Sequence, residues 1–263
     1  MIEIKDLAVT GKNQVKLLDN IEFSLALDDT IALTGGSGAG KTTLVKAIMG
    51  ILDDTCTIVR GDILLEGKSI LKMSGTQRRL LCGTMIGFIP QNPMTAFDSQ
   101  YKIGKQMVET FRMRLKLNKK DALDLVHNVL SKVNLSDTNR IISSYPSQLS
   151  GGMLQRITMA ILWGLKPKYI LADEPTSALD EENRDLLIQL LLDYPEKCGI
   201  IFLSHDATAI QKLCANTMIM ESGSIIEKAP TTEIFQMPKA DWTKRFVKSS
   251  NLIEGGEWQW TKL

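Results

Sequence analysis

One glycine-rich string constrains the fold of this chain more than any other feature of its sequence. The string Gly35-Gly-Ser-Gly-Ala-Gly-Lys-Thr42 follows the apolar run Thr30–Thr34 and precedes residues 44–49, whose apolar members recur at helical spacing. A strand, a glycine loop and a helix in this order form a phosphate-binding loop, because glycines let backbone N–H groups approach phosphate oxygens and a helix N-terminus attracts anions. The chain therefore needs a fold that presents this loop beyond the carboxyl end of a strand.

The residue types of this loop predict a nucleotide as its ligand. At this spacing Lys41 reaches the β- and γ-phosphate oxygens, and the hydroxyl of Thr42 ligates magnesium. We expect the phosphates to be held by the consecutive residues Gly35, Gly36, Ser37, Gly38, Ala39, Gly40, Lys41, Thr42 and Thr43.

The remaining apolar runs predict an α/β core around the loop. Continuous apolar runs at Tyr169–Ala172 and Ile200–Leu203 are typical of parallel strands buried on both faces, and a helical segment follows each. Other strand-like runs and two charged segments of helical periodicity complete the pattern. The strand-like runs occupy 2–9, 21–27, 63–65 and 85–90, and the helical segments occupy 103–115 and 121–133.

Composition excludes several classes of protein. The 263 residues include 31 basic and 30 acidic side chains, which is not the charge pattern of a dedicated nucleic-acid binder. The N-terminus carries alternating charges, and no apolar run reaches membrane-spanning length, so we expect neither a secretion signal nor a membrane span. Four dispersed cysteines and two histidines predict free thiols and no transition-metal cage.

Two acidic residues stand at the end of a predicted strand. Asp173 and Glu174 directly follow the run Tyr169–Ala172, where side chains enter the crevice beyond the strand ends. We expect Asp173 to hold magnesium and Glu174 to act as general base on the attacking water. An isolated acidic pair would more often only solvate a strand end, so this interpretation depends on the phosphate-binding loop.

A second candidate anion site opens a predicted helix. Ser150 stands at the N-cap position, and Gly151 and Gly152 leave the first turn bare. Free N–H groups, a hydroxyl and the positive end of the helix dipole would therefore face an anion. An ordinary N-cap is the alternative for this pattern taken alone.

Six segments together resemble, in order and approximate spacing, the motifs of ABC ATPases. They are Gly35–Thr42 (Walker A), Gln91 (Q-loop), Leu149–Gln155 (signature), Asp173-Glu174 (Walker B), Ser177–Asp180 (D-loop) and His205 (H-switch). The resemblance covers about residues 1–235. It implies a P-loop NTPase core with a mostly parallel sheet, an antiparallel β portion at the N-terminal side and a helical subdomain inserted at about 92–160. A short C-terminal tail would follow at 236–263.

The resemblance also implies the cofactors and a catalytic group. ATP and Mg²⁺ would bind together, with Thr42, Gln91 and Asp173 around the ion. Glu174, His205 and Gln91 would form the catalytic group, in which His205 contacts the γ-phosphate and Gln91 touches the ion or the attacking water.

Two further motifs imply that one chain holds only part of each ATP site. Ser150, Gly151 and Gly152 would face the phosphate-binding loop of a second ATPase subunit, and Asp180 would lie at the interface between the two. The partners implied are that second subunit, in a heterodimer or a homodimer, and two transmembrane permeases. An extracytoplasmic solute-binding protein would act indirectly, and no nucleic acid is implied. The chain would then be peripheral at the cytoplasmic face of the membrane.

Details of the motifs favour one branch of the family. Met153 stands where the family usually has Gln, and Ser150–Arg156 resembles the nickel and peptide importer branch. Segments 91–98 and 237–244 resemble the Q-loop of that branch and its C-terminal His-Pro-Tyr-Thr element. The branch implies import of nickel, a metal–chelator complex or short peptides. No aromatic residue stands where many relatives stack adenine, so the base would rest on an aliphatic residue such as Val15.

Non-transport ABC ATPases are the alternative. A DNA-repair ATPase would need a long coiled coil between its halves, and the insertion here is far too short for one. A translation-associated relative would usually carry two cassettes on one chain, whereas this sequence has one. The sequence therefore favours transport.

Overall fold

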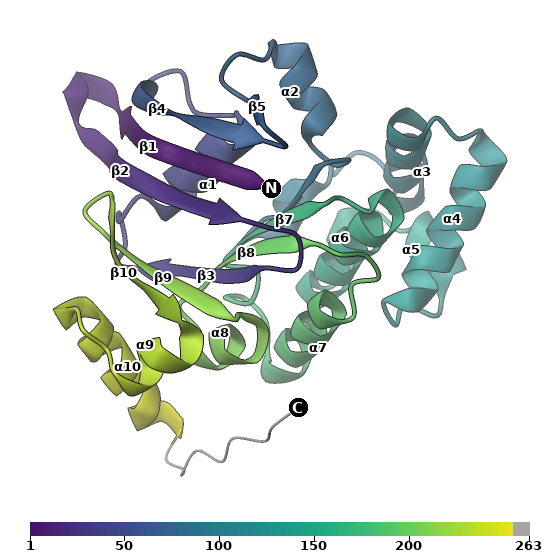
Figure 1. Cartoon of the computed structure of the whole chain (residues 1–263). Helices are drawn as coiled ribbons and strands as arrows, with labels where there is room; N and C mark the ends of the chain where they lie inside the picture. The colour runs from purple at the N-terminus through teal and green to yellow at the C-terminus, as the bar shows by residue number, and fades with distance from the viewer. Residues whose placement is uncertain (255–263) are drawn as a thin grey trace.

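Two β-sheets form the frame of the protein, whose computed structural model describes residues 1–254 (Figure 1). The first sheet is antiparallel, with strand order β2-β1-β4-β5. Its strands are β1 (Ile2–Thr10), β2 (Lys16–Leu25), β4 (Thr57–Leu65) and β5 (Lys68–Ser69). This sheet is the antiparallel portion that the sequence predicted. Strands β2 and β4 begin several residues before the predicted runs, because their first halves interrupt short apolar pairs with polar residues and glycine.

The second sheet carries the phosphate-binding loop. Its order is β10-β9-β3-β8-β7-β6, and every pair is parallel except β10 with β9. The strands are β3 (Thr30–Gly35), β6 (Ile86–Ile89), β7 (Tyr169–Asp173), β8 (Gly199–Leu203), β9 (Asn216–Glu221) and β10 (Ser224–Pro230). Since β3 and β7 lie on either side of β8, the loop after β3 and the acidic residues at the end of β7 open at the same edge of the sheet.

Helix α1 (Lys41–Met49) separates the two sheets. Leu44 and Ile48 of α1 are fully buried in one hydrophobic cluster that also contains Ile4 of β1 and Leu33 of β3. This cluster fixes the start of α1, and with it the phosphate-binding loop, against both sheets. Helices α6 (Gly151–Leu165), α7 (Glu181–Leu192) and α8 (Ala207–Leu213) contribute to a second cluster that includes Ala172 and Phe202, on the opposite face of the second sheet.

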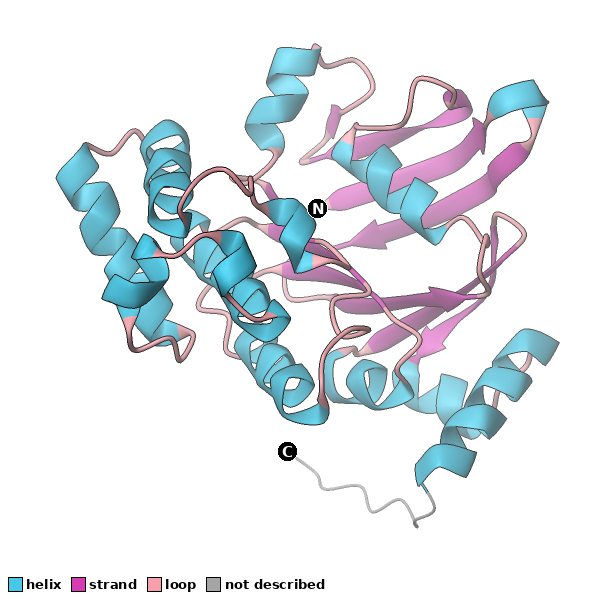
Figure 2. Cartoon of the chain, turned by 180° about the vertical axis from the view of Figure 1, so that it is seen from behind, coloured by secondary structure: helices cyan, strands magenta, loops and turns pink. Residues whose placement is uncertain are grey.

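The helical insertion forms between β6 and α6 and stands to one side of the sheets in Figure 2. It contains α3 (Ile103–Leu115), α4 (Lys119–Lys132) and α5 (Thr138–Ser143), preceded along the chain by α2 (Gly75–Leu81). Short 3-10 helices cover Lys12–Gln14, Pro93–Ala96 and Pro146–Gln148. Buried residues of α3 and α4 share one cluster with Ile157 of α6. Helix α6 therefore joins the insertion to the α/β core.

Residues after β10 continue as helices in the described part of the chain. Helix α9 (Thr231–Gln236) leads to α10 (Asp241–Glu254), where Val247 is buried. The part of the expected tail at 255–263 lies outside the described residues. Within residues 1–254, no helix has the length and hydropathy needed to cross a bilayer.

Candidate active site

The phosphate-binding loop is shaped by glycines that no other residue replaces without strain. Gly35 ends β3 with φ +150°, and a β-carbon there would collide with the carbonyl group of Met220 on β9. Gly40 has φ +101°, and its β-carbon would lie 2.7 Å from the carbonyl oxygen of Leu17. Both positions lie against backbone of neighbouring segments, so the close packing of the loop requires glycine at each.

Lys41 is buried within the loop. Its side chain is only 7% exposed, and Nζ donates to the carbonyl oxygens of Gly35 at 2.6 Å and Gly36 at 3.1 Å. Burial lowers the pKa of Lys41, while the negative charges of Glu174 and Asp173 act in the opposite direction. An ammonium group that is desolvated and held mainly by neutral carbonyls is suited to receive an anionic ligand.

Asp173 lies beside the first turn of α1. The hydroxyl of Thr42 donates to Oδ2 of Asp173 at 3.5 Å, which brings together residues 131 positions apart. Burial raises the pKa of Asp173, and the neighbouring charge of Glu174 raises it further. The ionised carboxylate of Asp173 therefore lacks sufficient stabilisation by positive charge. A divalent cation bound beside it would provide that stabilisation.

Glu174 contacts two other predicted site residues. Its Oε2 accepts a hydrogen bond from Nε2 of Gln91 at 3.0 Å, and its Oε1 lies 3.2 Å from Nε2 of His205. Glu174 has φ +46°, an uncommon conformation for a residue with a side chain, and its N–H donates to the carbonyl oxygen of Leu203. Burial lowers the pKa of His205, Lys41 lowers it further, and Glu174 opposes both effects. The imidazole is thus neutral near pH 7.

The signature residues and Asp180 form a separate cluster. Ser150 is the N-cap of α6 and accepts from the N–H of Met153 at 3.2 Å, as its position predicted. Asp180 is the N-cap of α7 and binds Asn183 through backbone and side chain. A β-carbon on Gly152 would lie 2.7 Å from Oδ1 of Asn183, so the two helix N-termini are neighbours. Within residues 1–254, no hydrogen bond joins this cluster to the phosphate-binding loop.

Two residues of this region escaped the sequence analysis. A pocket of about 300 Å³ beside the acidic residues is lined by Glu174, Thr176, Ser177, Leu179, Arg184, Ser204, His205 and Asp206. Arg184 of α7 lies 3.7 Å from Oδ2 of Asp206, the residue after His205, and 3.4 Å from Oδ1 of Asp185. Their position in the sequence could have identified Asn183 and Arg184 as site residues. Both stand on the first helical turn after Asp180, which keeps their side chains close to the D-loop.

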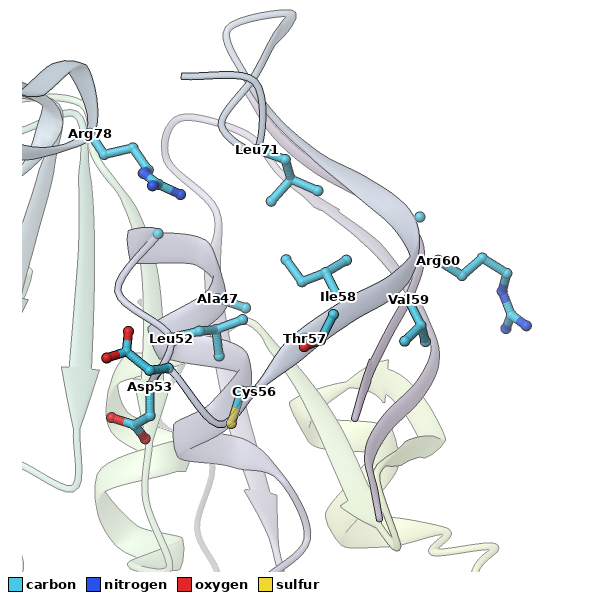
Figure 3. Close-up of a pocket in the computed structure, with 13 residues that line it drawn as sticks. Ala47, Leu52, Asp53, Cys56, Thr57, Ile58, Val59, Arg60, Leu71 and Arg78 are labelled. Carbon is cyan, nitrogen blue, oxygen red and sulfur yellow. The ribbon is translucent and has the colours of Figure 1, made fainter. Parts of the chain in front are cut away.

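Another pocket is larger but holds none of the predicted site residues. It measures about 610 Å³ and lies between α1, β4 and α2, where Ala47, Ile58, Arg60 and Arg78 line it (Figure 3). The charged groups that surround the phosphate-binding loop are absent from its lining. We therefore place the chemistry at the loop and at the smaller pocket.

Comparison with known proteins identifies one family. A family model described as ABC transporter matches residues 18–177. The chain is 32% identical over 256 residues to the metal-staphylopine import system ATP-binding protein CntD of Staphylococcus aureus strain Mu50, covering 96% of this chain and 94% of that protein. It is 33% identical over 248 residues to the oligopeptide transport ATP-binding protein OppD of Lactococcus lactis subsp. cremoris strain SK11, covering 94% of this chain and 73% of that protein.

Solved structures show the same fold. A post-hydrolysis dimer of the ATP-binding cassette MJ0796 bound to ADP and phosphate superimposes with a TM-score of 0.77 at 19% identity, covering 88% of this chain and 99% of that one. The ATP-binding subunit of an ABC transporter gives a TM-score of 0.75 at 23% identity, covering 95% and 99%. The predicted fold class is thereby confirmed.

Proposed function

Because the chain belongs to the ABC transporter family, we propose that it is the ATP-hydrolysing subunit of an importer. Membership of the family makes the chain an ATPase whose hydrolysis powers transport. The observation that carries the proposal is the cluster in which Lys41, Asp173, Glu174, Gln91 and His205 meet around the phosphate-binding loop.

The cluster supports a direct attack of water on the γ-phosphate. Glu174 takes the proton as the water oxygen bonds to phosphorus, and the bond to the β-phosphate oxygen breaks to release ADP and phosphate. Gln91 and neutral His205 contact the two carboxylate oxygens of Glu174, and these contacts orient it. We expect His205 also to donate to the γ-phosphate, and Lys41 to neutralise charge on the transferring group.

A magnesium ion fits the donor set beside the loop. The hydroxyl of Thr42, the carboxylate of Asp173 and the amide oxygen of Gln91 are hard oxygen ligands, which Mg²⁺ prefers in proteins. The raised pKa of Asp173 also indicates a carboxylate that lacks a positive partner. The ion would neutralise the charge of the phosphate oxygens.

Two chains would complete each other's sites. Ser150, Gly151 and Gly152 present a helix N-terminus with free N–H groups, which suits the γ-phosphate held by a second ATPase subunit. Asp180 would then lie at the interface. We expect a heterodimer in the cell, and self-pairing when the chain is purified alone.

The transported solute is a small molecule that binds to other subunits of the transporter and not to this chain. The names of the relatives support a metal–chelator complex or an oligopeptide, and nickel stays a prediction from the signature segment. Two transmembrane permeases would carry the solute, and a solute-binding protein would deliver it. The chain would work as a peripheral subunit on the cytoplasmic side of the membrane.

Uptake by membrane vesicles containing the complete transporter tests this function. Vesicles are supplied with nickel alone, a nickel–chelator complex or a labelled oligopeptide, together with ATP on the side of this subunit. We expect accumulation of one of the three, and its loss with Lys41→Ala, because that variant lacks the charge that meets the phosphates. The matched control is Lys197→Ala, an exposed lysine paired with Asp28 far from the loop in sequence. Equal uptake with Lys41→Ala and the control would contradict the proposal.

A further inference from the structure

An aromatic ring from the C-terminal helix lies on the phosphate-binding loop. A β-carbon on Gly36 would lie 3.5 Å from Nε1 of Trp242, so the edge of the indole lies beside this glycine, on the side from which a side chain would project. Trp242 belongs to segment 237–244, which the catalytic cluster does not use. Helix α10, which carries it, lies beside α9 in Figure 1.

Hydrogen bonds at the start of α10 fix the position of Trp242. Glu227 of β10 accepts hydrogen bonds from the backbone N–H groups of Lys239 and Ala240, both at 2.9 Å, and from the hydroxyl of Thr243 at 2.6 Å. Thr243 is fully buried. Burial acts to raise the pKa of Glu227, but these hydrogen bonds outweigh it and the pKa is lowered. The ionised carboxylate therefore caps the N-terminus of α10 and anchors it to the sheet.

The ring itself is held on its other side by aromatic packing. Trp242 stacks on Phe246 with ring centroids 5.2 Å apart and an interplanar angle of 16°, and Phe246 packs against Phe235 of α9 at 6.0 Å. An indole fixed in this way presents a rigid edge to Gly36.

Gly36 is the part of the loop that this edge restrains. Its carbonyl oxygen accepts from Nζ of Lys41 at 3.1 Å and from the N–H of Ala39 at 3.2 Å. Gly36 does not have the left-handed φ of Gly35, Gly38 and Gly40, so its backbone conformation is open to other residues. The ring occupies the side where a larger side chain would project. Glycine at this position leaves the loop free to move unless something packs against it.

We propose that Trp242 is a positioning residue for the phosphate-binding loop, holding Gly36 and thereby raising the affinity of the loop for nucleotide phosphates. The inference rests on the proposed function, because it concerns the ATP site of the same ATPase. A restrained glycine loses less conformational freedom when phosphate binds, and this lowers the cost of ordering the loop.

Nucleotide titration of the full-length chain tests the proposal, with Mg·ADP and Mg·ATP as probes. Trp242→Ala should weaken affinity by about three- to tenfold, and Trp242→Tyr, which keeps a flat ring, should restore most of it. In the assembled transporter, Trp242→Ala should raise the KM for ATP more than it lowers kcat. The matched control is Val247→Ala, which removes a buried side chain five residues further along the same helix. It should lower the melting temperature and leave the nucleotide affinity unchanged.

A spectroscopic measurement does not depend on how well Trp242→Ala folds. Replacing Trp163, Trp258 and Trp260 by Phe leaves Trp242 as the single tryptophan. Its fluorescence should change saturably on nucleotide binding, and a chain that keeps only Trp163 should change less.

The possible failures can be told apart. If the wild-type chain binds no nucleotide, the proposed function fails. If it binds nucleotide but the single-Trp242 signal stays constant, or if Val247→Ala weakens binding as much as Trp242→Ala, only the role of Trp242 is overturned.

Discussion

At the scale of single residues, the site holds charges that the folded chain does not neutralise by itself. Burial lowers the pKa of Lys41 and raises the pKa of Asp173, so both charged forms are disfavoured relative to water. A nucleotide that carries phosphates and a cation would supply a partner to each. The same desolvation that disfavours these charges in the empty site should therefore favour binding of a nucleotide with its cation.

Replacing Glu174 by Gln tests the assignment of the general base. Gln keeps the size and the hydrogen bonding of the side chain but accepts no proton, so ATP should bind normally while turnover falls by about a hundredfold or more. Direct ATP titration and phosphate release measure the two effects. The control is Glu182→Gln, an exposed acid on the first turn of α7. Turnover close to that of the wild type would show that another group takes the proton.

Replacing Asp173 by Asn should stabilise the nucleotide-free chain. The folded-state pKa of Asp173 is raised, so its ionised form costs stability above that pKa, and the cost disappears as pH falls through it. The gain from Asn should therefore be largest near about pH 7.5 and vanish near about pH 4. Thermal melting should show a higher melting temperature for Asp173→Asn than for the wild type at the higher pH.

Asp124→Asn on an exposed face of α4 is the control, and it should leave the melting temperature unchanged at both pH values. A gain for Asp173→Asn that grows as pH falls would show that burial of the ionised carboxylate is not its cause.

At the scale of elements, two helix N-termini form the second cluster. Ser150 caps α6 and Asp180 caps α7, and Asn183 contacts both Asp180 and Gly152. The first turns of both helices keep backbone N–H groups free, and their dipoles point positive ends outward. Because Asn183 leaves no room for a side chain at position 152, the two helix starts pack closely against each other.

Ser150→Arg tests whether the start of α6 serves a site on another chain. The arginine side chain would fill the space before the helix N-terminus and block a γ-phosphate there, so hydrolysis at the partner's loop should fall. The measurement uses a mixed assembly in which this chain also carries Glu174→Gln, so that only the partner's site turns over. Ser150→Thr, which keeps the capping hydroxyl, should retain the rate. An unchanged rate with Ser150→Arg would mean that the site is not composite.

At the scale of the whole molecule, the chain is divided between a loop cluster and a signature cluster. Within the described residues, no hydrogen bond connects them. The loop cluster contains the acidic residues, Lys41 and the start of α1, whereas the starts of α6 and α7 belong to the signature cluster. This division favours an ATPase whose nucleotide sites are completed only when it pairs with a second subunit.

Turnover should therefore depend on assembly. The isolated chain should hydrolyse ATP slowly, with a rate per chain that rises with protein concentration as chains pair. Adding the second ATPase subunit and the permeases should raise turnover severalfold. Phosphate release at equal concentrations of this chain measures the effect, and the same assembly with Lys41→Ala shows the contribution of this chain's own loop. A rate per isolated chain that is already maximal and independent of concentration would contradict the composite site.

The sequence by itself determined the parts of the protein that depend on local pattern. The glycine string, the apolar runs of β7 and β8 and the position of the acidic pair at the end of β7 predicted a phosphate-binding loop in an α/β core. Helices α3 and α4 also lie where periodicity placed them. These features could be predicted from the sequence because strand burial, helical spacing and loop geometry are set by residues close together in the chain.

The tertiary structure alone decided how distant residues meet. It buried Lys41, brought Glu174 to Gln91 and His205, and packed Asn183, which binds Asp180, against Gly152. It also turned residues after β10 into a packed helix that carries Trp242 to Gly36. No local pattern encodes these contacts, because strand order, burial and charge are set by packing between segments far apart in sequence.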